Sequence, residues 1–251
     1  MQDSISIEIC VDSVGSAVAA ERGGATRIEL CSDLLEGGIT PSAGMIELVR
    51  ARTSVGLQIM IRPRGGDFCY NADEFETMQR DILAAKKLGA DGVVLGVLHP
   101  DASVDIDRTR RLVQQARPLN VTFHRAFDLS ADLFRALEDI CAAGPDRILT
   151  SGAEPAATQA VDVIARLVHA ARGRIAIMAC GGIREQNVVQ IIEQTGVKEI
   201  HTGLRSAAKP PQDQTQPKIS LGTVAGLEYQ GFQVREEDVH RLRRAVDLVH
   251  I

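Results

Sequence analysis

Aromatic residues are scarce in this sequence: Phe, Trp and Tyr make up only 3% of its 251 residues, and tryptophan is absent. Proteins that bind single-stranded nucleic acid stack the bases on aromatic side chains, so this scarcity argues against that class. The net charge is −5 and lysine and arginine form no cluster, which argues against binding along a phosphate backbone. We therefore expect no nucleic-acid partner.

Long apolar runs are also missing. No segment is long and apolar enough to cross a membrane, and residues 1–4 lack the basic start and apolar run of a signal peptide. The chain has five cysteines, an odd number, and no C-x-x-C spacing. We interpret them as the reduced thiols of a cytoplasmic protein that has no membrane partner.

Two short segments near the start of the chain alternate between apolar and other residues, as β-strands do. In the first, Glu8 and Cys10 share the face opposite the isoleucines; in the second, Glu29 and Cys31 share a face in the same way. In a parallel barrel wrapped in helices, the apolar faces pack outward and these four side chains point into the barrel. An inward glutamate requires a partner, because an unpaired buried charge is costly.

Eight segments with strand character alternate with helical segments along the chain. The expected strands are residues 4–11, 26–31, 57–62, 91–97, 120–124, 146–150, 174–179 and 198–202. A helix-ending glycine, a short polar step and a β-branched residue recur before every second strand, at Gly24, Gly89, Gly144 and Gly196. This pattern predicts an α/β fold, a (β/α)8 or TIM barrel, with one domain over residues 1–251. Residues 206–234 receive no assignment.

Ligand sites of such barrels lie at the carboxyl ends of the strands and in the loops that follow. Cys10 and Cys31 end the first two strands, and soft thiolates prefer Cu(I) or Zn(II), so this pair is a candidate metal site. Cys180 ends the seventh strand, and Cys69 follows the third. Cysteine is also a common small buried residue, so a purely structural role stays open.

Glu8, Glu29, Arg62 and His124 form a second candidate site at the same end of the barrel. Two carboxylates and a histidine offer acid–base catalysis or ligands for a divalent metal, and Arg62 would orient an anion. The alternative is a buried ion-pair network that closes the barrel interior. His201 joins this set only if its short strand turns it inward.

Glycines follow the seventh and eighth strands, where barrels of this type often bind phosphate. Gly181, Gly182 and Gly203 expose backbone N–H groups, and Arg205 adds a positive charge. Arg64 lies in a further glycine-containing loop, directly after the third strand. We expect a small anionic ligand to be bound by Arg62, Arg64, Gly181, Gly182, Gly203 and Arg205. The alternative is that the glycines only form turns.

Several motifs, taken together, resemble the CutC copper homeostasis family. They are ICVDS at 9–13, RIELC at 27–31, EGG at 36–38, TPS at 40–42, MIRPRGGDF at 60–68, VTFHRAFD at 121–128, LTSG at 149–152 and GGI at 181–183. The resemblance implies a cytoplasmic (β/α)8 barrel that forms homo-oligomers, dimers or tetramers, with a link to copper tolerance. It also implies Cu(I) binding by Cys10 and Cys31. Cys180 departs from the family pattern, in which glycine or proline is expected.

Three hypotheses about function follow. The first is a copper homeostasis protein that binds Cu(I) through Cys10 and Cys31. The second is an enzyme that acts on a small anionic substrate bearing phosphate or carboxylate, with Glu8, Glu29 and His124 transferring protons. The third is an oligomeric scaffold without catalysis.

Overall fold

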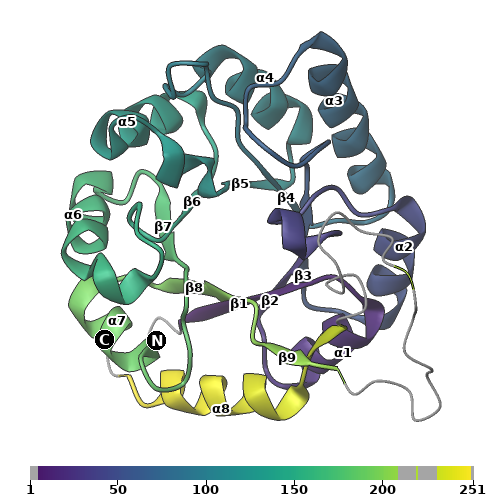
Figure 1. Ribbon diagram of the computed structural model, residues 1–251, viewed down its shortest axis with the longest axis vertical. Coiled ribbons are helices and arrows are strands. Elements are labelled where there is room, and N and C mark those ends of the chain that lie inside the picture. Colours follow the sequence, from purple (N-terminus) through teal and green to yellow (C-terminus); the bar gives the residue numbers. More distant parts are fainter. Residues whose placement is uncertain (1–4, 209–218, 220–230, 250–251) are drawn as a thin grey trace.

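Eight parallel strands form a closed barrel in the computed structural model, which describes residues 5–208, 219 and 231–249 (Figure 1). Each strand pairs with the next along the chain, and the last pairs with the first. The strands are β1 (Ser6–Val11), β2 (Arg27–Leu30), β3 (Gly56–Met60), β4 (Gly92–Leu95), β5 (Asn120–Phe123), β6 (Arg147–Thr150), β7 (Ala176–Ala179) and β8 (Glu199–Thr202). The predicted (β/α)8 barrel is confirmed.

Helices form a ring outside the barrel (Figure 1). They are α1 (Val14–Arg22), α2 (Ala43–Arg52), α3 (Ala72–Lys87), α4 (Ile106–Ala116), α5 (Leu133–Ala143), α6 (Val161–Ala171), α7 (Val188–Thr195) and α8 (Glu236–Asp247). Short 3-10 turns η1 (Leu34–Glu36), η2 (Arg125–Leu129) and η3 (Ala157–Gln159) follow β2, β5 and β6. Local sequence sets the ends: a capping box of Asn71 and Glu74 begins α3, and Gly144 and Gly196, both at positive φ, end α5 and α7. None of the described helices is long and apolar enough to span a bilayer.

The core lies between the barrel and the helices and is mostly aliphatic, with Phe123 and Phe127 as its largest fully buried side chains. Ile7, Ile9, Ile28 and Leu30 are buried in it, so the outward faces of β1 and β2 carry the apolar residues, as the alternation predicts. The intervening residues of these strands therefore face the barrel interior.

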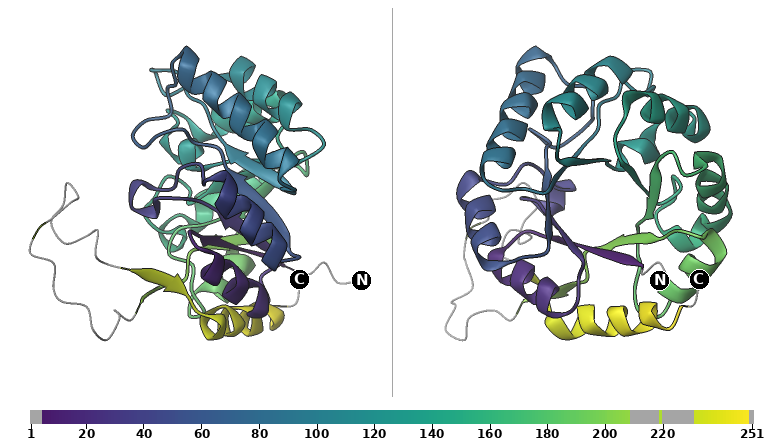
Figure 2. Two further views of the ribbon diagram at one scale, coloured as in Figure 1. Left: turned by 90° about the vertical axis from the view of Figure 1, so that its right-hand side faces the viewer. Right: turned by 180° about the vertical axis from the view of Figure 1, so that it is seen from behind.

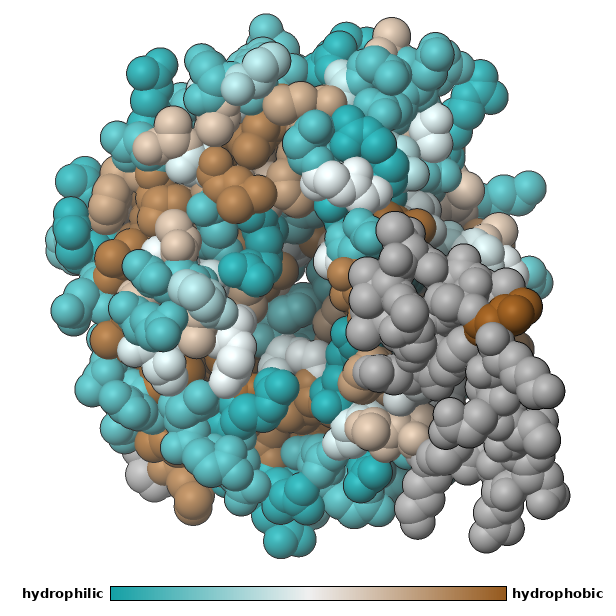
Figure 3. Space-filling view, viewed as in Figure 1, coloured by the Kyte–Doolittle hydropathy of each residue, from teal (hydrophilic) through white to brown (hydrophobic). Residues whose placement is uncertain are grey.

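The strands end on one face of the barrel, which we call the mouth; this face is toward the viewer in Figure 1. Figure 3 shows the same face, with a hollow at its centre. After β8 the chain forms β9 (Arg205–Ala207), which pairs antiparallel with β10 (Phe232–Val234). This pair projects on the mouth side (Figure 2, left). These two strands lie at the two ends of residues 206–234, the segment for which no structure was predicted. Within that segment, residues 209–218 and 220–230 lie outside the described residues.

Candidate functional site

Glu8 is the central buried charge of the barrel interior. Strand register places it beside Arg27 on β2 and His201 on β8. One carboxylate oxygen accepts a hydrogen bond from Arg27 Nε at 2.8 Å, and the other lies 2.8 Å from His201 Nδ1. Burial by itself raises the pKa of Glu8, but the His201 hydrogen bond and the Arg27 charge outweigh it and lower the pKa to about 2.

Below Glu8, toward the strand starts, lies a layer of paired charges that we call the floor. Arg27 donates to Glu199 at 2.6 Å, and Arg147 donates to the same carboxylate at 2.5 Å. Arg147 also donates to Thr122 on β5. The floor thus joins four strands, as the hypothesis of a structural ion-pair network expects, although its residues differ from those that the strand-end pattern indicates.

Glu29 lies above this layer and is less well paired. Its Oε2 atom is 3.5 Å from Cys31 Sγ and 3.8 Å from His201 Nε2. Its Oε1 atom is buried and has no partner in the described part of the chain. Burial, and then the negative charge of Cys10, raise the pKa of Glu29 well above its ordinary value.

His201 connects the two carboxylates, because its ring nitrogens face Glu8 and Glu29 respectively. Burial lowers its pKa, but the charge of Glu29 and its hydrogen bonds with Cys10 and Glu8 prevail and raise the pKa well above the ordinary value. The surroundings of His201 therefore favour its imidazolium form. Its orientation does not follow from the sequence alone, because a four-residue strand has too few positions to show which face is apolar.

Cys10 and Cys31 lie at the top of this column of polar groups. Both are buried, at 8% and 1% exposure, and their sulfur atoms are 3.8 Å apart. The hydrogen bond from Cys31 lowers the pKa of Cys10 to about 5; burial opposes this shift and His201 supports it. The same hydrogen bond, followed by burial, raises the pKa of Cys31. These shifts favour a pair of one thiolate and one thiol.

The donor atoms near this pair suit a metal ion. Cys10, Glu29 and Cys31 offer ligand atoms within 4.8 Å of one another, and so do Glu8, Glu29 and His201. Two sulfurs bound to one metal at about 2.3 Å lie roughly 3.8 Å apart in tetrahedral geometry and about 4.6 Å apart in a straight line. The observed separation of 3.8 Å therefore accommodates one ion with little or no movement of the backbone.

Arg62 is buried, but its guanidinium faces a loop. It donates to the carbonyl oxygens of Glu36, Gly38 and Gly66 at 2.7–2.9 Å and lies 5.0 Å from the ring centre of Phe68. Within the described residues it has no hydrogen bond or ion pair with either buried glutamate. The structure thus shows Arg62 holding the loops after β2 and β3 together.

His124 is also buried and also lies outside the group formed by Glu8, Glu29 and His201. Its Nδ1 accepts a hydrogen bond from the Ala126 N–H, and its ring packs 4.7 Å from the ring of Phe68. Burial, followed by the nearby Arg62 charge, lowers the pKa of His124 to about 3, so it is neutral. Its Nε2 atom has no partner in the described part of the chain.

The expected anion site is spread over three loops. Gly181 and Gly182 have φ of +89° and +67°, and neither N–H has an acceptor among the described residues. Arg205 packs over the ring of Phe232, 4.4 Å from its centre, and Gly203 precedes it by two residues. Arg64, in contrast, forms ion pairs beside α3, with Asp67 at 3.0 Å and Glu74 at 2.5 Å.

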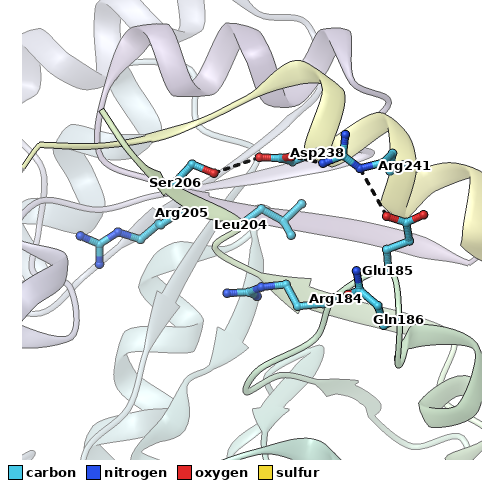
Figure 4. A pocket seen from close by; sticks show the side chains of 8 residues that line it. All are labelled: Arg184, Glu185, Gln186, Leu204, Arg205, Ser206, Asp238 and Arg241. Carbon is cyan, nitrogen blue, oxygen red and sulfur yellow. Dashed lines mark hydrogen bonds and ion pairs between the residues drawn. The ribbon is translucent and has the colours of Figure 1, made fainter. Parts of the chain in front are cut away.

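Arg205 also lines a pocket of about 210 Å³ beside the mouth (Figure 4). The loop before α7, the start of β9 and helix α8 contribute its side chains, which are Arg184, Glu185, Gln186, Leu204, Arg205, Ser206, Asp238 and Arg241. Two carboxylates occupy the same walls as three arginines, and Arg241 pairs with both of them. The pocket is therefore not uniformly positive.

Cys180 does not join the thiol pair. It is buried against Leu149 and Met178 in a separate cluster, and burial raises its pKa. Cys69 and Cys141 are free and partly buried.

Comparisons with known proteins agree with the motifs. The sequence model of the CutC family matches residues 5–206. The chain is 44% identical over 237 residues to the copper homeostasis protein cutC homolog of Mus musculus, which covers 94% of this chain and 86% of that protein. It is 45% identical over 235 residues to the family protein CutC of Parabacteroides distasonis, covering 93% and 97% of the two chains.

Solved structures give the same result. CutC from Streptococcus agalactiae superposes with a TM-score of 0.74 at 34% identity, over 78% of this chain and 97% of that chain. Thiamine phosphate pyrophosphorylase from Pyrococcus furiosus superposes with a TM-score of 0.58 at 18% identity, over 97% and 96% of the two chains, which shows a shared fold alone. The barrel fold, the strand-end motifs and these relatives lead to one conclusion: the chain belongs to the CutC family of copper homeostasis proteins.

Proposed function

We propose that this protein binds Cu(I) through Cys10 and Cys31 and so acts in copper homeostasis. The observation that supports this proposal is the pair of free, buried thiols with sulfur atoms 3.8 Å apart. Thiolates are soft ligands and prefer Cu(I), and a buried site shields the ion from water. The copper ion is the protein's cargo in this proposal.

The charges around the pair also favour a monovalent cation. Two thiolates and one Cu(I) carry a net charge of −1, and the His201 imidazolium beside Cys10 offsets it. A buried charge is tolerated when such a partner is at hand. His201, whose position is fixed by its hydrogen bond with Glu8, would therefore neutralise the net negative charge of the copper-loaded site.

The same proposal places the protein in the reducing cytoplasm, as a homo-oligomer. Five free cysteines support the compartment, because paired thiols at this spacing would be exposed to oxidation elsewhere. The oligomeric state is checked by light scattering of the purified protein, with and without copper.

An anaerobic titration with Cu(I) against a chromogenic chelator tests the proposal. We expect about one high-affinity Cu(I) per chain, and loss of that site in the Cys10→Ser, Cys31→Ser double variant. Cys141→Ser, which alters a thiol on α5, is the matched control and should bind as the wild type does. Equal affinity in the double variant and the control would exclude this site.

A second candidate function is an enzyme that acts on a small anionic substrate. The observation that favours it is the position of His201 between two carboxylates, at 2.8 Å from Glu8 and 3.8 Å from Glu29. Environments that drive two carboxyl groups to opposite protonation states are typical of acid–base sites. Here Glu29 would be the acid and Glu8 the ionised group that orients His201.

In this candidate the substrate's anionic group would lie against the N–H groups of Gly181 and Gly182. Phosphate should then raise the melting temperature in proportion to its occupancy, and Gly182→Val should remove the effect. Gly144→Ala, a positive-φ glycine at the end of α5 with open space around it, controls for backbone strain. The absence of any shift at high phosphate concentration would exclude the anion site and favour the copper or scaffold hypothesis.

A further inference from the structure

The thiol pair has neighbours of two kinds. Glu29 and His201 offer oxygen and nitrogen ligand atoms. Cys10 and Cys31 also pack with Met60, Val94 and the partly buried Leu34. Met60 therefore brings a third sulfur atom to the buried cluster that contains both thiols.

Strand register explains why Met60 lies there. Glu29 pairs with Gln58 and Leu30 with Ile59 across β2 and β3, so the next residues, Cys31 and Met60, are neighbours at the strand ends. Ile59 packs in the outer core, and Met60 therefore points to the barrel interior with Cys31. Met60 is only 5% exposed.

The other interior methionine is engaged elsewhere. The sulfur of Met178 accepts a hydrogen bond from Arg27 at 3.2 Å, and its side chain packs with Leu149 and Cys180. Both Met178 and Cys180 belong to β7 or its end, across the barrel from β3. Among the described residues of the thiol cluster, Met60 is the additional sulfur donor.

We propose that the thioether of Met60 is the third ligand of Cu(I) at the Cys10–Cys31 site and makes that site selective for Cu(I) over Zn(II). This inference rests on the proposed Cu(I) binding. A thioether is soft, so it binds Cu(I) well and Zn(II) poorly, whereas Glu29 and His201 offer the donors that Zn(II) accepts. The thiol pair thus has a set of three sulfurs for Cu(I) and a mixed set for Zn(II).

The Met60 side chain is well suited to this bond. Methionine has three rotatable side-chain bonds and adapts to irregular spaces, so its sulfur can turn toward an ion between the thiolates. The thioether is neutral and forms a simple dative bond, so its binding releases no proton and adds no charge to a buried site.

Selenium X-ray absorption tests the contact directly. The chain has five methionines, and replacing all of them with selenomethionine puts a selenium atom at position 60. After loading with one Cu(I) per chain without oxygen, we expect the selenium spectrum to show copper at bonding distance from about one selenium in five. Met60→Leu, which conserves volume, should lose this signal, and Met45→Leu on α2 should keep it.

Affinity measurements complete the test. Loss of a residue that only orients a metal ligand lowers metal affinity roughly 10- to 100-fold. We expect Met60→Leu to weaken Cu(I) binding by at least that factor and to leave the Zn(II) affinity unchanged. If the wild type binds Cu(I) but no copper appears near selenium, Met60 is not a ligand and the two-thiol site stands. If the wild type binds no Cu(I), the proposed function fails, and this inference fails with it.

Discussion

The floor and the mouth of this barrel differ in how completely their buried polar groups are paired. In the floor, Arg27, Glu199 and Arg147 satisfy one another through short ion pairs. In the mouth, Glu29 keeps an oxygen without a partner among the described residues, and two thiols face each other without a disulfide. Fully paired groups have no capacity left for a ligand, whereas the mouth retains such capacity. This difference is consistent with a structural role for the floor and with the proposed binding at the mouth.

Breaking the floor should give the largest effect. Glu199→Leu leaves Arg147 without a carboxylate partner and Arg27 with Glu8 alone, and removal of one partner from a buried ion network costs about 3–5 kcal/mol. Urea unfolding measures the loss in the free energy of unfolding. If stability falls by much less, the floor is not the structural element that its ion pairs suggest.

The second largest effect is expected in how the free energy of unfolding falls at low pH, where Glu8 contributes. Burial raises the pKa of Glu8, but His201 and Arg27 lower it to about 2 from 4.5, so the folded state binds this proton more weakly than the unfolded chain does. Its contribution is complete above pH 4.5 and is lost as the pH falls toward 2, by an amount on the order of 3 kcal/mol. Unfolding in urea from pH 6 to pH 3 should show a shallower acid limb for Glu8→Gln than for the wild type. Parallel curves for the two proteins would contradict this.

Neutralising the mouth carboxylate should have the smallest effect on stability. Burial, and then Cys10, raise the pKa of Glu29, so its charge is unfavourable in the folded state at neutral pH. Glu29→Gln puts a neutral group of the same shape at this position, and we expect the free energy of unfolding to stay within about 1 kcal/mol of the wild type or to increase. A loss as large as that of Glu199→Leu would show that Glu29 is a structural residue like those of the floor.

The sequence predicts the barrel well because each strand carries its own signal. Alternation in β1 and β2 gives the inward face, and the repeated glycine turn marks the αβ connections, including Gly144 and Gly196, which the structure places at helix ends. These are local properties, so they are visible without knowledge of the tertiary contacts. The inward positions of Glu8 and Glu29 follow from the same alternation.

The partners of those residues depend on long-range register, which the sequence does not show. His201 meets Glu8 only because β8 closes the barrel against β1, 193 residues apart in sequence. Arg62 sits at a strand end that the sequence marks as functional, yet loop carbonyls bind its guanidinium. Met60 is an apolar residue that sequence patterns do not distinguish from other core residues. Only the register of β2 and β3 shows that it lies beside Cys31.

Anomalous X-ray scattering at the copper edge, from crystals loaded with Cu(I) without oxygen, tests the central claim most directly. We expect one copper peak in the mouth, between the sulfur atoms of Cys10 and Cys31. A peak at the partly buried thiols of Cys69 or Cys141 instead, or no peak while the paired sulfurs remain 3.8 Å apart, would contradict the assignment of metal binding to the mouth.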